Sequence, residues 1–296
     1  MHTLKKNYIE YLIALVLFGT NGVLASHISL TSVQIVFLRT GIGSLLLVSL
    51  FLIKGGRFHI RKDLKAYGFL TLAGIMMGSS WMLLYEAYRY VGVSIASLCM
   101  YSSLVLVMIS SFFLFKEPLT HRKLLSFLIA SSGTFLVNVS ALTEQLSIHG
   151  LILGMCSCCT YAAMIISAKL APQLPDLEKS TWQLITSFLT TAVFSFFRGQ
   201  LLFTIHTNEL GWILTLGLVN TGLGCFLYYS SISKLPAQTI AICDNIELLS
   251  AILSSVVFLN ERLEKIQILG AVLIIAGAIS SALTTSIRNR SAIHTY

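Results

Sequence analysis

Two acidic side chains stand near the middle of an apolar segment, Ala237 to Leu259, that contains no Lys, Arg or Pro. About 23 residues at 1.5 Å each can cross a hydrocarbon core of about 30 Å. Inserting an Asp at the centre of such a helix costs about 2.5–3.5 kcal/mol, so neighbouring helices must shield it. Asp244 and Glu247 are three residues apart and therefore share one helix face. We expect that face to look into the protein interior or a water-filled cavity, as a substrate or proton site or as a structural link to another helix.

Arg39 is the one cation deep inside an expected span, about 9 Å from its end. It is suited to clamp a substrate carboxylate, to pair with Glu247, or to snorkel outward. Aromatic and amide groups near the middle of other spans can stack on and hydrogen-bond to an organic solute, and each also suits ordinary helix packing. The candidate substrate-binding residues are Asn21, Arg39, Trp81, Tyr85, Tyr101, Tyr161, Tyr228, Asp244 and Glu247.

The composition indicates a multi-pass membrane protein. Of the 296 residues, 55% are hydrophobic and only 11% are charged, against about 25% charged in soluble domains. The net charge of +8 is spread over short loops, so we expect membrane orientation and no nucleic acid partner. All six cysteines lie in apolar spans, and the cluster Cys156-Ser157-Cys158-Cys159 lacks a second ligand pair. We therefore expect no disulfide framework, metal or cofactor.

Apolar windows predict an all-α fold with ten spans and brief connections. Fifteen Lys and Arg residues fall on one side, four on the other, and Arg39 lies within a span. This asymmetry predicts that both termini face the cytoplasm of a cell membrane. The expected spans are residues 8–25, 33–53, 67–88, 93–115, 124–139, 149–170, 182–197, 210–232, 237–259 and 266–284.

Side chains at the ends of these spans suggest anchors and latches. Glu117 and Glu261 end the fourth and ninth spans on opposite faces, as a gate latch or as ordinary capping and solvation. No Pro falls inside a span, so Pro-broken helices near the midplane are not expected. The expected interfacial anchors are Tyr8, Tyr11, Tyr67, Tyr90 and Trp212.

An internal repeat organises the chain. A shift of 144 residues places Glu117 on Glu261, Gly78 on Gly222 and Ser110-Ser111 on Ser254-Ser255. Each half then holds five spans, with residues 1–140 as the first repeat and 145–290 as the second. Because five is odd, the halves must enter the membrane in opposite directions, which gives the inverted-topology repeat of many secondary transporters.

The segment from Leu235 to Gly277 resembles the C-terminal signature of the EamA family of the drug/metabolite transporter superfamily. The shared pattern is a small-residue helix with an acid, then Leu-x-Glu-Arg-Leu, then a helix with Gly. Leu114-Phe115-Lys116-Glu117-Pro118-Leu119 repeats it in the first half, and Arg39 resembles the second-span arginine of the family. Many relatives have Glu-Pro where this chain has Glu247-Leu248. The resemblance implies export of amino acids, other metabolites or drugs.

We therefore expect a secondary transporter that moves a small organic, amino acid-like solute across the lipid bilayer by alternating access, with proton coupling through Glu247 or Asp244. The chain has no Walker motif for ATP. A flippase for a lipid or lipid precursor is the alternative, and a lateral opening with a dry groove would favour it. An intramembrane enzyme is less favoured, because no His-Glu-x-x-His or Gly-x-Ser-x-Gly motif occurs. A homodimer stays open.

Overall fold

The computed structural model describes residues 2–139, 147–171, 174–260 and 264–293, and these ranges contain helices, turns and loops but no strand. The segment η4 is a π-helix. The elements in chain order are α1 (His2–Gly19), α2 (Asn21–Ala25), α3 (Ser32–Ile53), η1 (Ile60–Lys62), α4 (Leu64–Tyr101), α5 (Ser103–Leu114), α6 (His121–Asn138), α7 (Ile148–Lys169), α8 (Asp176–Phe197), η3 (Thr207–Glu209), α9 (Leu210–Thr215), η4 (Leu216–Leu223), α10 (Gly224–Ile232), α11 (Ala237–Cys243), α12 (Asn245–Leu259) and α13 (Lys265–Ile293).

Within the described residues, seven helical segments are long and apolar enough to cross a membrane. The helices α6 and α8 lie where short spans were predicted, but α8 begins at Asp176, six residues before the predicted start. Its polar first turns contain Asp176, Glu178 and Lys179. The seven segments are Lys6–Ala25, Ser32–Ile53, Leu64–Gly92, Ile95–Leu114, Ile148–Lys169, Thr207–Ile232 and Ala237–Leu259.

Local sequence signals explain where the helices begin and turn. Thr31 and Gln34 form a reciprocal capping box at the start of α3. Asp63, Thr120 and Ser147 accept backbone N–H groups at the starts of α4, α6 and α7. Gly92 has a φ of 72° inside α4 and marks a sharp turn between two successive spans. Only glycine adopts this conformation readily, so the turn depends on the missing side chain.

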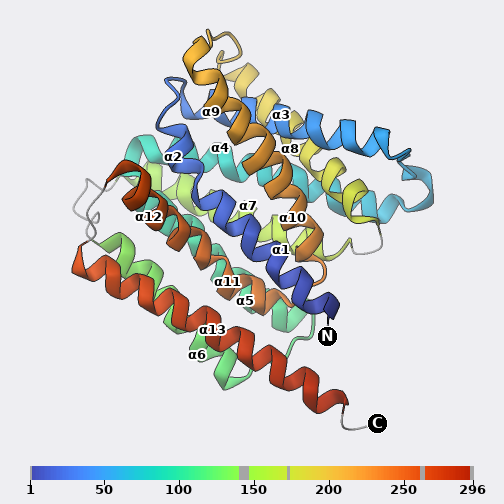
Figure 1. The fold of residues 1–296 in the computed structure, drawn as a ribbon, viewed down its shortest axis with the longest axis vertical. Coiled ribbons are helices and arrows are strands. Elements are labelled where there is room, and N and C mark those ends of the chain that lie inside the picture. The colour runs from blue at the N-terminus through green and yellow to red at the C-terminus, as the bar shows by residue number, and fades with distance from the viewer. Residues whose placement is uncertain (1, 140–146, 172–173, 261–263, 294–296) are drawn as a thin grey trace.

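The helices lie side by side in a bundle (Figure 1). The helix α1 packs against α10 and α12, α3 against α8 and η4, and α4 against α7 and α8. The helices α6 and α13 lie side by side along one edge of the molecule, far from α3 and α9. A Cβ atom at Gly133 would lie 2.5 Å from the carbonyl oxygen of Gly270, so these two helices touch backbone to backbone.

Several spans are interrupted near their middle although none contains a proline. A single turn residue separates α1 from α2 at Thr20, α4 from α5 at Ser102, and α11 from α12 at Asp244. The eighth predicted span includes the π-helix η4. Such interruptions free backbone groups and often mark functional positions within helices. The expectation that Pro-broken helices are absent holds for these residues, but the helices still break.

Two predicted anchors are buried within the protein. Tyr11 is fully buried, because its ring stacks on Tyr228 and its hydroxyl donates to Asp244. Tyr67 is also buried and donates a hydrogen bond to Glu178. Tyr90 and Trp212 are exposed, and Tyr8 is partly buried.

Of the two latch residues, Glu117 has a defined capping role. Its carboxylate accepts hydrogen bonds from the N–H groups of Ala237 at 2.8 Å and Gln238 at 3.1 Å, so it caps α11 from the end of the fourth span. This geometry fits the capping interpretation. Its counterpart Glu261 lies outside the described residues, as does most of the junction between the expected repeats.

Candidate functional site

Asp244 stands at the break between α11 and α12 and is 1% exposed. Its carboxylate accepts a hydrogen bond from the hydroxyl of Tyr11 at 2.5 Å and from that of Tyr161 at 3.1 Å. The hydroxyl of Tyr228 lies 3.4 Å from both carboxylate oxygens. We name Asp244 with Tyr11, Tyr161 and Tyr228 the tyrosine cage. It joins α1, α7, α10 and α11.

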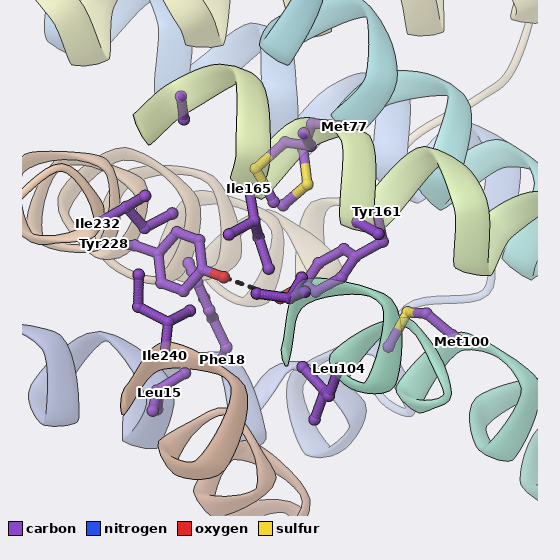
Figure 2. Packing of buried hydrophobic residues seen from close by; sticks show 14 of the residues in the cluster. Leu15, Phe18, Met77, Met100, Leu104, Tyr161, Ile165, Tyr228, Ile232 and Ile240 are labelled. Atoms are coloured by element: carbon purple, nitrogen blue, oxygen red, sulfur yellow. Dashed lines mark hydrogen bonds between the residues drawn. The ribbon is translucent and has the colours of Figure 1, made fainter. Parts of the chain in front are cut away.

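Aromatic packing holds the cage in place. The rings of Tyr11 and Tyr228 stack at a centroid distance of 5.4 Å, and Phe18 also packs against the ring of Tyr228, at 5.5 Å. Figure 2 shows the hydroxyls of Tyr161 and Tyr228 facing each other among buried apolar side chains, with 2.9 Å between their oxygens. Because a buried carboxylate without donors would cost several kcal/mol, the three hydroxyls are what permits Asp244 to stay at this depth.

Arg39 has no comparable set of partners. It is 5% exposed, and its guanidinium carbon lies 4.3 Å from the ring centroid of Trp81. Its Nε is buried without a hydrogen-bond acceptor. No carboxylate of a described residue lies within the 4.0 Å limit for an ion pair with it. A cation–π contact recovers about 2 kcal/mol at a dry site, less than the cost of burying the charge.

Glu247 lies one turn after Asp244 and is half-buried. It makes no hydrogen bond or ion pair with the described residues, yet it lies within electrostatic range of Arg39 and Asp244. Tyr88 is within range of both Glu247 and Arg39. A cation, an anion and two aromatic rings therefore lie near one another, and neither charge is neutralised by direct contact. We name Arg39, Trp81, Tyr88 and Glu247 the charged region.

Asn21 sits at the break in the first span. Its Oδ1 accepts from Nδ2 of Asn220 at 3.0 Å, and the same nitrogen donates to the Leu17 carbonyl at 2.7 Å and to Thr20 at 2.8 Å. Asn220 belongs to the π-helix η4. The amide therefore satisfies the backbone group that the end of α1 leaves free.

The predicted site residues thus fall into separate groups. Asp244, Tyr161 and Tyr228 meet in the cage, whereas Arg39, Trp81 and Glu247 belong to the charged region. Tyr85 is half-buried and packs edge-on against Tyr88 at 5.2 Å, so it joins the charged region through that ring. Tyr101 is within electrostatic range of Glu247 and lines a separate groove.

Two residues of these groups were not predicted as site residues from the sequence. Tyr11 was predicted to be an anchor, and Tyr88 was not predicted to act. The spacing of Trp81, Tyr85 and Tyr88, which puts all three on one helix face, is a signal that could have identified Tyr88.

The groove is a hollow of about 340 Å³ between α4, α5, α6, α7 and α12. Val105, Phe135 and Met155 form its mouth, and each of these side chains is more than 40% exposed. Tyr101, Thr134 and Asn245 form its floor. Among the described residues no group of His, Cys, Asp or Glu could hold a metal ion.

Comparison with known proteins identifies the family. The profile of the EamA-like transporter family matches residues 6–139 and again residues 148–283. The chain belongs to this family. Both halves therefore carry the family unit, and the protein is a membrane transporter.

The similar proteins are also transporters by name. The chain is 28% identical to the uncharacterized transporter YxxF of Bacillus subtilis (strain 168), over 91% of this chain and 87% of that protein. It is 24% identical to the biotin transporter of Escherichia coli (strain K12), over 81% and 79%. A crystal structure at 15% identity superposes with a TM-score of 0.80, covering 94% of this chain and 99% of the other, which supports the fold alone.

Proposed function

We propose that this EamA-like transporter is a ten-span secondary transporter built from two inverted five-span halves, residues 1–140 and 145–290. It lies in the cell membrane with both termini in the cytoplasm. Two kinds of observation support the repeat. Outside glycine, the described residues have left-handed backbone at Lys116, with φ of 53°, and at Asn260, with φ of 56°. These residues are 144 apart and end corresponding helices.

Close helix contacts recur with the same shift. A Cβ at Gly133 would lie 2.5 Å from the Gly270 oxygen, and a Cβ at Gly277 would lie 2.7 Å from the Ser126 oxygen. Adding 144 to residues 133 and 126 gives 277 and 270. One contact is therefore the image of the other, as a two-fold relation between the halves requires.

A second pair of contacts behaves in the same way. A Cβ at Gly78 would lie 2.8 Å from the Ser187 oxygen, and one at Gly43 would lie 3.0 Å from the Gly222 nitrogen. Residues 43 and 78 shifted by 144 become 187 and 222. Since each half has an odd number of spans, a two-fold axis relating them lies in the plane of the membrane.

The proposed cargo is a small organic solute that carries a carboxylate, of the amino acid-like class or a related metabolite. The unpaired, buried Arg39 is the observation that carries this proposal. A solute carboxylate would neutralise the guanidinium bidentately while Trp81 holds its plane. Glu247 and Tyr88 would face the rest of the solute. The biotin transporter that this chain resembles is named for a solute with a carboxylate, which fits the proposal.

The tyrosine cage is proposed to close the cytoplasmic end of the path. The whole of α11 is buried. At the other end of the first span Asn21 is half-buried, and a Cβ atom at Gly22 would meet nothing within 4 Å. Alternating access then requires the cage to separate and the outer ends to converge. Export is the direction we propose, with proton coupling through Glu247.

The test is uptake and efflux in proteoliposomes with a panel of carboxylates, including biotin and aromatic amino acids, with and without a pH gradient. We expect one class of carboxylate to be transported and its amide analogue to be rejected. In the same assay Glu247→Gln should abolish the response to the pH gradient while binding persists. Unchanged rates and pH response in this variant would show that Glu247 is not the proton site.

A flippase remains the second candidate because a lateral groove is present. No charged side chain lines that groove, so it offers nothing to a polar headgroup crossing the membrane. Scrambling of fluorescent phospholipid in the same vesicles, at a rate matching solute transport, would favour the flippase instead.

A further inference from the structure

The groove between α4, α5, α6, α7 and α12 lies at the depth of the lipid tails. Val105 at its mouth is ten residues from Ile95 and nine from Leu114, the two ends of its span. At 1.5 Å per residue this places the mouth about 15 Å from either end, close to the bilayer midplane. Hydrocarbon is the only solvent at that depth.

The two most buried polar side chains of the floor, Thr134 and Asn245, are hydrogen-bonded within the protein. The hydroxyl of Thr134 donates to Oδ1 of Asn245 at 2.5 Å. The amide nitrogen of Asn245 donates to the carbonyls of Ala241 at 3.3 Å and Ile242 at 3.0 Å. These buried groups already have partners within the protein, so they require nothing from an occupant.

The mouth is apolar. The side chains of Val105, Phe135 and Met155 are exposed around it, and a space of about 340 Å³ opens between them. Leaving such a space empty would forfeit dispersion contacts on every wall, and water in it would meet mostly apolar surface.

We propose that the groove is a binding site for one acyl chain of a bilayer lipid, which enters sideways from the membrane. The chain end lies against Tyr101 and Asn245, next to the helix breaks at Ser102 and Asp244. The lipid tail then completes the wall that separates the charged region from the bilayer. This site goes beyond the proposed transport function and does not depend on which solute is carried.

The test uses the full chain in nanodiscs containing phosphatidylethanolamine with a diazirine near the end of one acyl chain. After photolysis, mass spectrometry of peptides locates the adducts. We expect adducts on the groove residues at several times the frequency found on other lipid-facing positions. A second phosphatidylethanolamine with the diazirine in the headgroup should leave the groove unlabelled.

Matched variants decide whether the groove itself is responsible. Val105→Trp fills the mouth and should lower the groove adducts at least fivefold. Ile109→Trp adds the same bulk one turn later on α5, at a side chain that is 50% exposed and outside the groove, and should change nothing. Ser131→Leu is a smaller filler if Val105→Trp does not fold, as judged by size-exclusion chromatography.

Four results would overturn the proposal. Adducts spread evenly over the lipid-facing surface would mean that the groove does not hold a chain, as would a filler variant with undiminished groove labelling. Headgroup labelling inside the groove, or competition by a transported solute, would assign it to a permeation path instead. Transport activity is measured separately, so a failure of the solute proposal leaves this test intact.

Discussion

Removing one hydroxyl from the tyrosine cage should open the cytoplasmic end of the transporter. Tyr11→Phe deletes the donor that lies 2.5 Å from the Asp244 carboxylate and keeps the ring that stacks on Tyr228. A hydrogen bond to a charged group contributes about 1.5–3 kcal/mol. If the bond exists only in the closed arrangement, the ratio of closed to open molecules falls roughly ten- to a hundredfold, since 1.4 kcal/mol is a factor of ten.

The chain supplies its own reporter for this change. Cys243 precedes Asp244 on α11 and is buried in the closed arrangement. With the other five cysteines replaced by Ala or Ser, a membrane-impermeant maleimide added from the cytoplasmic side should label Cys243 slowly. In Tyr11→Phe the labelling rate should rise at least tenfold, because the same thiol becomes accessible more often.

Tyr8→Phe is the matched control. It makes the same substitution one turn earlier on α1 and removes a hydrogen bond to the neutral Thr239 hydroxyl at 3.2 Å. A neutral bond contributes about 0.5–1.5 kcal/mol, so labelling should rise by only about two- to twelvefold, less than in Tyr11→Phe. The reasoning fails if Tyr11→Phe labels at the parental rate, or if both variants respond equally.

Two other substitutions test the charged region and the repeat. Arg39→Lys keeps the charge but loses the planar group over Trp81. The KM for a transported carboxylate should therefore rise at least tenfold, with little change in the KM for any uncharged solute. Equal changes for both solutes would remove Arg39 from the solute site. Gly133→Ala forces a Cβ to 2.5 Å from the Gly270 oxygen and should lower the free energy of unfolding by about 1–3 kcal/mol. Gly22→Ala is the control, because a Cβ there meets nothing within 4 Å, and it should not lower this free energy. Thermal unfolding in detergent measures both effects.

The intramembrane acids could be found from the sequence because their cost in hydrocarbon is so large. Asp244 and Glu247 stood out in an apolar segment, and the structure puts one of them at 1% exposure and the other half-buried. The sequence also carried the duplication, which the two matches to the family profile confirm. These features depend on composition and spacing, which are local or periodic properties of the chain.

The partners of Asp244 could not be found in the same way. Tyr11 and Tyr161 are 233 and 83 residues away along the chain, and nothing in their local sequence specifies which helices pack together. Tyr11 was predicted only as an anchor, because nothing near it in the sequence indicates that it stacks on Tyr228 and donates to Asp244. The break at Ser102 has no proline or glycine beside it to signal it.

Asp244, Arg39 and Glu247 have different surroundings, which favours separate roles for them. Asp244 has three hydroxyl donors, so the protein has already compensated its desolvation in this arrangement. Arg39 and Glu247 lie within range of each other without direct contact, so their desolvation is compensated only in part. A solute with a carboxylate beside Arg39 would complete that compensation and would be held where the halves meet. On this proposal the fully satisfied acid would stabilise a closed end and the unsatisfied pair would provide the binding free energy, so mutation should alter the two functions separately.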